Sequence, residues 1–122
     1  LPRMKTDLAA LVDAFVNHDP LPEMEENDQA VLGVVLASKG YPKNPVHGQT
    51  LGQLPEVPGV EIDYANVAGS LDQLKGDGGR LLMVLAQADS LKEAQQRVYD
   101  YLDRLDEPEC FYRHDIGAKA FL

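Results

Sequence analysis

Two stretches of the chain place apolar residues at helical spacing, and the first lies near the amino terminus. Its apolar positions recur at i, i+3, i+4, i+7 and i+8, which predicts a helix with one hydrophobic face. These positions are Leu8, Leu11, Val12, Phe15 and Val16. Thr6 is the predicted N-cap, Asp7 lies in the first turn near the positive end of the helix dipole, and the segment 17–20 ends the helix.

The second helical stretch has clearer boundaries. Ser90 and Glu93 have the spacing of a capping box, which predicts that the helix begins at Ser90. Pro108 cannot continue a helix, so the pattern predicts an end at about Leu105. The apolar face consists of Leu91, Ala94, Val98, Tyr101, Leu102 and Leu105.

Strands are predicted between and after the two helices. The segments 30–37 and 80–88 are continuous apolar runs, which favours buried strands. The segment 60–65, VEIDYA, alternates apolar and polar residues and predicts a half-exposed strand. The segment 109–117, ECFYRHDIG, is aromatic and mixed and predicts a last strand.

Proline and glycine separate these elements. The segment 38–59 contains four prolines and four glycines and predicts a long loop, which is usually functional or packed over another part of a domain. GDGG at 76–79 predicts a turn with residues suited to positive φ, and the segment 66–75 either extends the strand pair or is irregular. The order of elements predicts an α+β fold, with two main helices on one side of a small antiparallel or mixed sheet.

Length, charge and cysteine content restrict the class of protein. The chain has 122 residues, 44% of them hydrophobic, which suffices for one domain with its own core. A formal net charge of −9 argues against binding to nucleic acid or to an anionic membrane, while leaving room for a small cationic site. No apolar run reaches the roughly 18 residues of a membrane span. Cys110 is the single cysteine, and no secretory signal pattern is present, so we expect a cytoplasmic location.

Candidate chemistry is limited to a few local features. No complete catalytic motif is present, and no catalytic residue is predicted. The histidines lie far apart and lack the spacing of metal ligands, so no metal site is predicted. Two glycine-containing segments lie at strand ends, where backbone N–H groups can approach a ligand. They supply the candidate substrate-facing residues Gly40, Tyr41, Pro42, Gly78, Gly79 and Arg80.

Each feature also has a purely structural interpretation. The segment 40–42 could be a plain turn with Tyr41 packed on the core. The Arg80 guanidinium matches the oxygens of a carboxylate or phosphate, or it could be a solvated residue after a hairpin turn. Arg113 and Asp115 are two positions apart and would share one face of a strand, which favours a salt bridge, or Asp115 could cap a turn at Gly117.

Three segments of the chain, in order, are VVLASKGYP, GDGGRLLMVLAQADSLKEAQQRVYDYL and FYRHDIG. Together they resemble the C-terminal domain of the glycinamide ribonucleotide synthetase family, the phosphoribosylamine–glycine ligases. The opening LPRMKTDL also resembles the helix start that follows the family's ATP-binding core. The resemblance implies that residues 1–122 form one C-terminal domain of a longer ATP-grasp ligase, with a linking helix at 1–20 and a sheet-and-helix core at 30–122.

The chain departs from the family pattern at several positions. Lys39 and Lys43 replace glycines that flank Gly-Tyr-Pro, Asp77 replaces an asparagine, and Ala88 stands where the family has glycine. The segment 63–67 is DYANV where the family usually has Phe-His-Ala-Gly-Thr. These departures concern ligand contacts at those positions and not the fold.

The resemblance implies a role in de novo purine biosynthesis. Members join glycine to 5-phosphoribosylamine while ATP becomes ADP and phosphate, and the ATP-grasp part binds ATP and Mg²⁺. This segment would bind no cofactor, would be inactive alone, and would close one wall of the active site. Two other interpretations remain, namely the C-terminal domain of a related ATP-grasp ligase and a non-catalytic binding or regulatory module.

Overall fold

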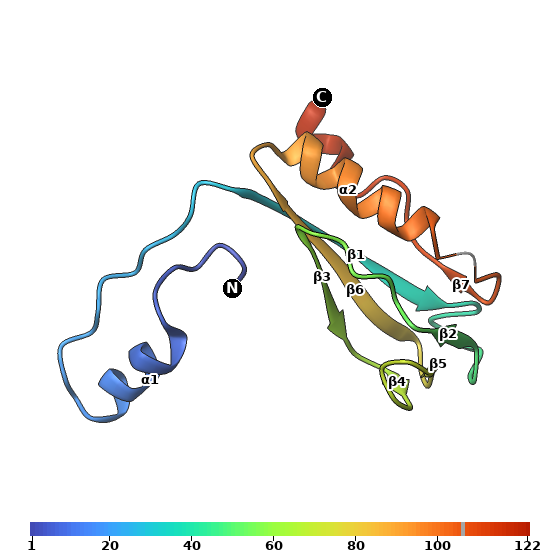
Figure 1. Ribbon diagram of the computed structural model, residues 1–122, viewed down its shortest axis with the longest axis horizontal. Helices are drawn as coiled ribbons and strands as arrows, with labels where there is room; N and C mark the ends of the chain where they lie inside the picture. Colours follow the sequence, from blue (N-terminus) through green and yellow to red (C-terminus); the bar gives the residue numbers. More distant parts are fainter. Residues whose placement is uncertain (106) are drawn as a thin grey trace.

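The computed structural model describes residues 1–105 and 107–122. The chain has two parts, an arm formed by residues 1–29 and a body formed by the rest of the described residues (Figure 1). The arm carries helix α1 and extends away from the body, which contains two antiparallel sheets and helix α2. The predicted α+β fold is confirmed.

The main sheet has four antiparallel strands in the order β3-β6-β1-β7. Its centre is formed by β1 (Ala30–Ser38) and β6 (Arg80–Ala88), and its edges by β3 (Val60–Tyr64) and β7 (Cys110–Phe111). The three strands predicted before the second helix are confirmed. The last strand is much shorter than predicted, because the chain leaves the sheet after two residues.

A second, smaller sheet lies beside the first and was not predicted. Its order is β2-β5-β4, from β2 (Thr50–Gly52), β5 (Leu74–Gly76) and β4 (Val67–Ala68). Strand β2 falls within the predicted long loop 38–59. Strands β4 and β5 fall within the segment 66–75, which was left open, and the start of the predicted turn 76–79. Two or three residues are too few to show an alternating pattern, so this sheet has no clear signal in the sequence.

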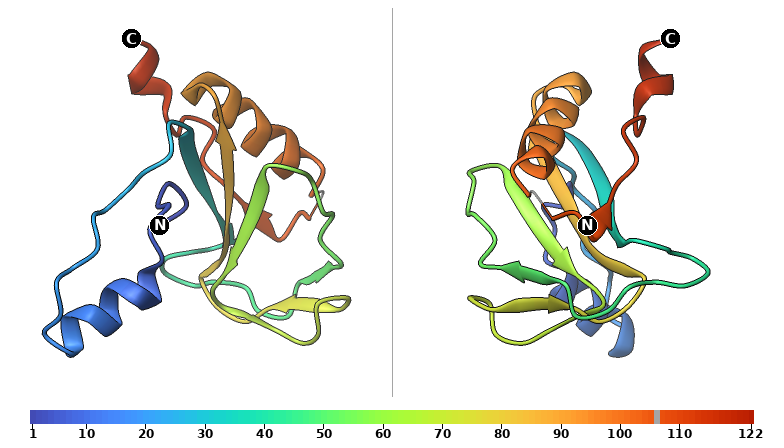
Figure 2. Two further views of the ribbon diagram at one scale, coloured as in Figure 1. Left: turned by 60° about the vertical axis from the view of Figure 1, so that its left-hand side comes forward. Right: turned by 90° about the vertical axis from the view of Figure 1, so that its right-hand side faces the viewer.

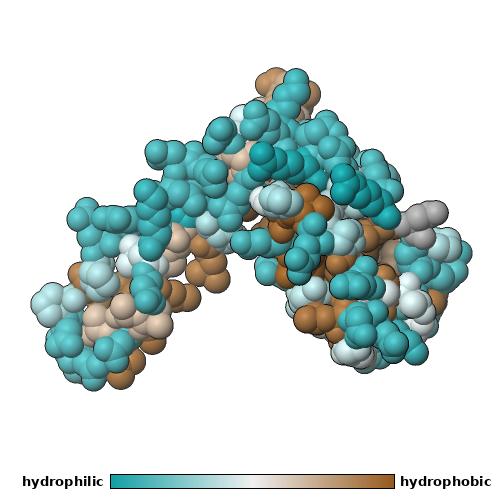
Figure 3. Space-filling model, in the orientation of Figure 1, coloured by the Kyte–Doolittle hydropathy of each residue, from teal (hydrophilic) through white to brown (hydrophobic). Residues whose placement is uncertain are grey.

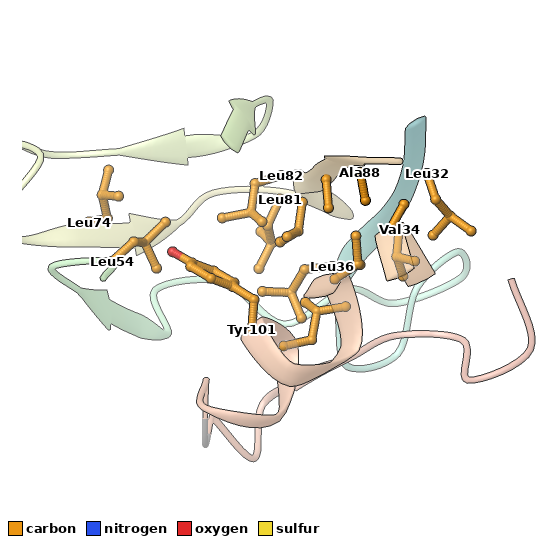
Figure 4. Packing of buried hydrophobic residues seen from close by; sticks show 14 residues of the cluster. Leu32, Val34, Leu36, Leu54, Leu74, Leu81, Leu82, Ala88 and Tyr101 are labelled. Atoms are coloured by element: carbon orange, nitrogen blue, oxygen red, sulfur yellow. The ribbon is translucent and has the colours of Figure 1, made fainter. Parts of the chain in front are cut away.

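Helix α2 (Leu91–Asp103) covers one face of the main sheet (Figure 2). Ser90 is its N-cap, as predicted, and the Glu93 N–H donates to Ser90 Oγ at 3.2 Å. Figure 4 shows the core between the helix and the two sheets, with Tyr101 reaching from α2 toward Leu54. Full burial of one large aliphatic side chain contributes about 1.5–3 kcal/mol, so this layer dominates the stability of the body. Its large fully buried side chains are Tyr101, Leu36, Leu81, Leu82, Leu102, Val34, Val84 and Val98.

Helix α1 (Leu8–Val16) begins one residue later than predicted. Its N-cap is Asp7, whose Oδ1 accepts from the N–H groups of Ala9 at 2.8 Å and Ala10 at 3.2 Å. The prediction of Thr6 as N-cap was wrong, because its hydroxyl bonds to the backbone of the segment that returns from α1 toward β1. Thr6 Oγ1 donates to the Glu23 carbonyl at 2.9 Å and accepts from the Glu25 N–H at 2.7 Å.

The apolar face of α1 is exposed. None of the nine residues of the helix is buried, and Phe15 and Val16 are 70% and 65% exposed. Figure 3 shows hydrophobic side chains at the surface of the arm. Within the described residues, α2 therefore covers the main sheet without α1, and the prediction that both helices lie on one side of the sheet was wrong. The chain ends in a short 3-10 helix, η1 (Ala118–Phe121).

Candidate functional site

The face of the main sheet opposite α2 carries the candidate site, and we call it the open face. In the ladder, Val35 pairs with Met83, and Asp63 pairs with Met83 from the other side. Directly paired residues project from the same face of a sheet, so these three side chains form one row. Val35 and Met83 are only partly buried, unlike the residues that face α2. The open face is therefore accessible to a ligand or to another part of a larger protein.

A hollow of about 270 Å³ lies on the open face, where β1 meets β7 and the turn that follows it. We call it the open-face cavity. Its surface is mainly apolar, and two arginines, Arg80 and Arg113, contribute to its lining. The apolar part includes Gly33, Val35, Ala37, Tyr41, Phe111 and Ile116. Arg80 also lines a second hollow of about 230 Å³, together with Asp63 and Asn66, so it stands between the two.

Arg80 reaches the open face because of an irregularity in the β1–β6 ladder. Leu36 pairs with Leu82, but the next residue, Ala37, pairs with Arg80, so Leu81 is an extra residue. Side chains alternate along a regular strand, and without the extra residue Arg80 would project toward α2 like Leu82. With it, Leu81 and Leu82 are both buried while Arg80 is exposed. The bulge thus sets the direction of the arginine.

The surroundings of Arg80 leave its charge available. Its carbonyl accepts from Asn66 Nδ2 at 2.8 Å, which fixes the backbone at the start of β6. Among the described residues, no carboxylate lies within 4.0 Å of its guanidinium. A guanidinium without an ionic partner, at the rim of an apolar hollow, suits an anionic ligand.

Arg113 is arranged differently. Its Nε and Nη2 donate to the two carboxylate oxygens of Asp115 at 3.0 and 2.7 Å, so the predicted salt bridge is confirmed. The hydrogen bonds from Arg113 hold the pKa of Asp115 below its ordinary value. The pair sits in a turn and not on a strand, contrary to the prediction. Arg113 therefore contributes a polar wall whose charge is compensated.

Of the six predicted substrate-facing residues, Tyr41 and Arg80 line the open-face cavity. Gly78 and Gly79 leave room for neighbouring side chains. A Cβ at Gly79 would overlap the Tyr41 ring, and a Cβ at Gly78 would lie 2.6 Å from the Asn66 Cβ. Positive φ at the turn 76–79 was a wrong prediction, since none of its glycines has it. They are needed for space and not for backbone conformation.

The other predicted segment forms a tight turn. Gly40 has a φ of 87°, a conformation that favours glycine, and its carbonyl accepts from the Asn44 N–H at 2.9 Å. Gly40 and Pro42 are not among the residues that line the cavity, so they shape the turn that presents Tyr41. The sequence did not reveal that Arg113 and Ile116 share this cavity. The only indication of their role in the sequence was the YRHDIG segment, and its position beside β1 depends on the fold.

A polar cluster lies beneath the site. Gln49 Nε2 donates to Ser38 Oγ at 2.8 Å, and Ser38 Oγ donates to the Gly78 carbonyl, so these bonds connect the long loop to the start of β6.

The described residues show no sign of a reactive thiol, a metal site or a membrane-spanning helix. Burial raises the pKa of the Cys110 thiol to about 11, which keeps it protonated and weakly nucleophilic at neutral pH. Across residues 1–105 and 107–122, no three His, Cys, Asp or Glu side chains could together hold a metal ion. No helix in the described part of the chain is both long and apolar enough to cross a lipid bilayer.

Comparisons with known proteins converge on one group. Residues 31–119 match the family described as the phosphoribosylglycinamide synthetase C domain. The phosphoribosylamine–glycine ligase of Halalkalibacterium halodurans is 40% identical over 98% of this chain and 28% of the relative. That of Lactococcus lactis is 39% identical over 98% of this chain and 29% of the relative. The crystal structure of the Thermotoga maritima phosphoribosylamine–glycine ligase matches with a TM-score of 0.76 at 28% identity, over 89% of this chain and 27% of that one.

The extent of these matches differs between the two parts of the molecule. The family match begins at residue 31 and so covers the body without the arm. The curated relatives match 98% of the chain, and therefore include the arm as well. The chain spans less than a third of the length of these relatives.

Proposed function

Because the chain belongs to the phosphoribosylglycinamide synthetase C-domain family, we propose that it forms the C-terminal domain of a phosphoribosylamine–glycine ligase. The observation that carries this proposal is that ligases of this name match the arm and the body together. The enzyme would join glycine to 5-phosphoribosylamine, with conversion of ATP to ADP and phosphate, in purine biosynthesis in the cytoplasm. An ATP-grasp part of the enzyme would bind ATP and Mg²⁺, so this chain alone is expected to form no ADP.

The role of the domain would be to close one wall of the active site with its open face. Support comes from the cavity, which combines an apolar lining with Arg80, an arginine that has no carboxylate within 4.0 Å among the described residues. An apolar floor cannot solvate a phosphate, which would therefore sit at the rim with Arg80. The carbon face of a ribose ring would suit the floor. The carboxylate of glycine is the other candidate anion. We prefer the phosphate, because a domain outside the ATP-binding part is better placed to hold the non-reacting end of a substrate.

The exposed face of α1 fits the same proposal. Four of its large apolar side chains are at least 45% exposed, and the relatives have more than two thirds of their length outside the matched segment. Apolar surface of this kind marks an interaction site in soluble proteins. We therefore place the remainder of the ligase as the partner that covers α1. Those side chains are Leu8, Val12, Phe15 and Val16.

Replacing Arg80 tests the substrate assignment in the full-length enzyme. Arg80→Ala should raise the KM for phosphoribosylamine by roughly ten- to a hundredfold, the equivalent of one hydrogen bond between charged groups. The KM values for ATP and glycine should change little. Steady-state kinetics with each substrate varied in turn gives the three values.

Arg104→Ala is the matched control, because it removes the same charge from an exposed position at the end of α2. It should leave the KM for phosphoribosylamine unchanged. Small and equal effects of Arg80→Ala on all three substrates would show that Arg80 is only a solvated residue at a strand end. A selective rise in the KM for glycine would show that Arg80 binds the carboxylate of glycine instead of the phosphate.

A further inference from the structure

Helix α2 holds the turn that follows β7 by two side chains. This turn, residues 112–117, has left the sheet, and its backbone groups need other partners. Tyr99 Oη donates to the Arg113 carbonyl at 2.8 Å and accepts from the Ile116 N–H at 3.0 Å. Gln95 Nε2 donates to the Ile116 carbonyl at 2.9 Å. Gln95 and Tyr99 are four residues apart, so they lie one above the other on the same side of α2. We call this pair the clasp.

The residues that the clasp holds are residues that line the open-face cavity. Arg113 and Ile116 both belong to its lining, whereas Tyr99 and Gln95 do not. The turn also lies directly against β1, because a Cβ at Gly117 would be 2.6 Å from the Leu32 Cδ1. The bond to Asp115 then fixes the Arg113 side chain relative to its own backbone. The position of this wall is therefore set by hydrogen bonds from α2.

We propose that Tyr99, assisted by Gln95, is a positioning residue that sets the wall formed by Arg113 and Ile116 opposite Arg80. This inference rests on the proposed function, since it assigns the cavity to phosphoribosylamine. Tyr99 acts through the turn and does not touch the substrate. Small displacements of positioned groups weaken binding and orientation strongly, so loss of the phenol hydroxyl alone should be measurable.

The test uses Tyr99→Phe in the full-length ligase, which removes both hydrogen bonds and keeps the ring. The KM for phosphoribosylamine should rise about three- to tenfold, because the loosened segment must be ordered again when the substrate binds, while kcat and the KM for ATP stay nearly constant. Hydrogen exchange should accelerate in the peptide containing Ile116, whose N–H loses its acceptor. Gln95→Leu should act in the same direction with a smaller rise in KM.

Tyr101→Phe is the matched control. Tyr101 lies on the same helix, and its hydroxyl donates to the Pro55 carbonyl at 2.7 Å, away from the cavity. This variant should lower thermal stability comparably and leave the KM for phosphoribosylamine unchanged. Equal KM changes in both variants, or an unchanged KM in Tyr99→Phe, would overturn the positioning role.

Arg80→Ala separates this inference from the proposed function. If Arg80→Ala raises the KM for phosphoribosylamine and Tyr99→Phe does not, the clasp has no positioning role and the substrate assignment stands. If exchange at Ile116 accelerates in Tyr99→Phe but neither variant changes that KM, the cavity does not hold phosphoribosylamine. Both the positioning role and the substrate assignment are then wrong.

Discussion

Helices α1 and α2 both have an apolar face at helical spacing, but only α2 buries it. In α2 the side chains Ala94, Val98, Tyr101 and Leu102 are fully buried, whereas none is buried in α1. Two residues join α2 to β6, so it folds back directly onto the sheet, whereas the segment 17–29 separates α1 from β1. An amphipathic pattern thus identifies a helix without identifying its partner. The partner of α2 lies in this chain, and we propose that the partner of α1 lies in the rest of a full-length ligase.

The largest effect is expected where α2 meets the sheet. Leu102 is 0% exposed, and Leu102→Ala leaves a cavity that its neighbours can fill only in part. The free energy of unfolding of this chain should fall by about 2–5 kcal/mol. Urea denaturation followed by circular dichroism provides the measurement. The equivalent change on α1, Phe15→Ala, should alter this value by less than about 0.5 kcal/mol.

A cost below about 1 kcal/mol for Leu102→Ala would be too small for a cavity in a packed core. It would remove the distinction between the two helices. A large fall in the free energy of unfolding for Phe15→Ala would also remove this distinction, because it would show that the apolar face of α1 is packed within this chain.

A smaller effect is expected from the helix caps, and it should differ between the helices. Ser90→Ala removes the acceptor of the Glu93 N–H and should destabilise the body by about 0.5–2 kcal/mol. Asp7→Ala removes an equivalent cap from α1. Because α1 does not pack on the body, the midpoint of denaturation of the body should stay constant in Asp7→Ala, while the helical circular dichroism signal of the chain decreases. If both substitutions shift the midpoint equally, α1 unfolds together with the body and the comparison fails.

The main strands and the second helix could be predicted because each is long enough to show its period. Strands β1 and β6 have nine residues each, and Ser90 with Pro108 delimits α2. The small sheet was missed, since its strands are too short for a pattern. The cap at Asp7 was assigned to Thr6 because both residue types cap helices well, and only the fold shows that Thr6 bonds to the returning chain.

The candidate site was predictable only in part. The glycine–arginine segment pointed to Arg80, but not to the bulge at Leu81 that turns it to the open face. A pair of adjacent leucines is compatible with either a regular or a bulged strand. The contribution of Ile116 could not be predicted, because it depends on hydrogen bonds from Tyr99 across 17 residues of sequence.

Amide hydrogen exchange, compared between this chain alone and the full-length ligase, tests the central claim most directly. Helix α1 has nine residues, and unsupported helices of this length are marginal in water. We predict that α2 is protected in both proteins, and that α1 exchanges rapidly in the isolated chain and slowly in the ligase. Equal protection of α1 in the two proteins would contradict the claim that the rest of the ligase covers its apolar face.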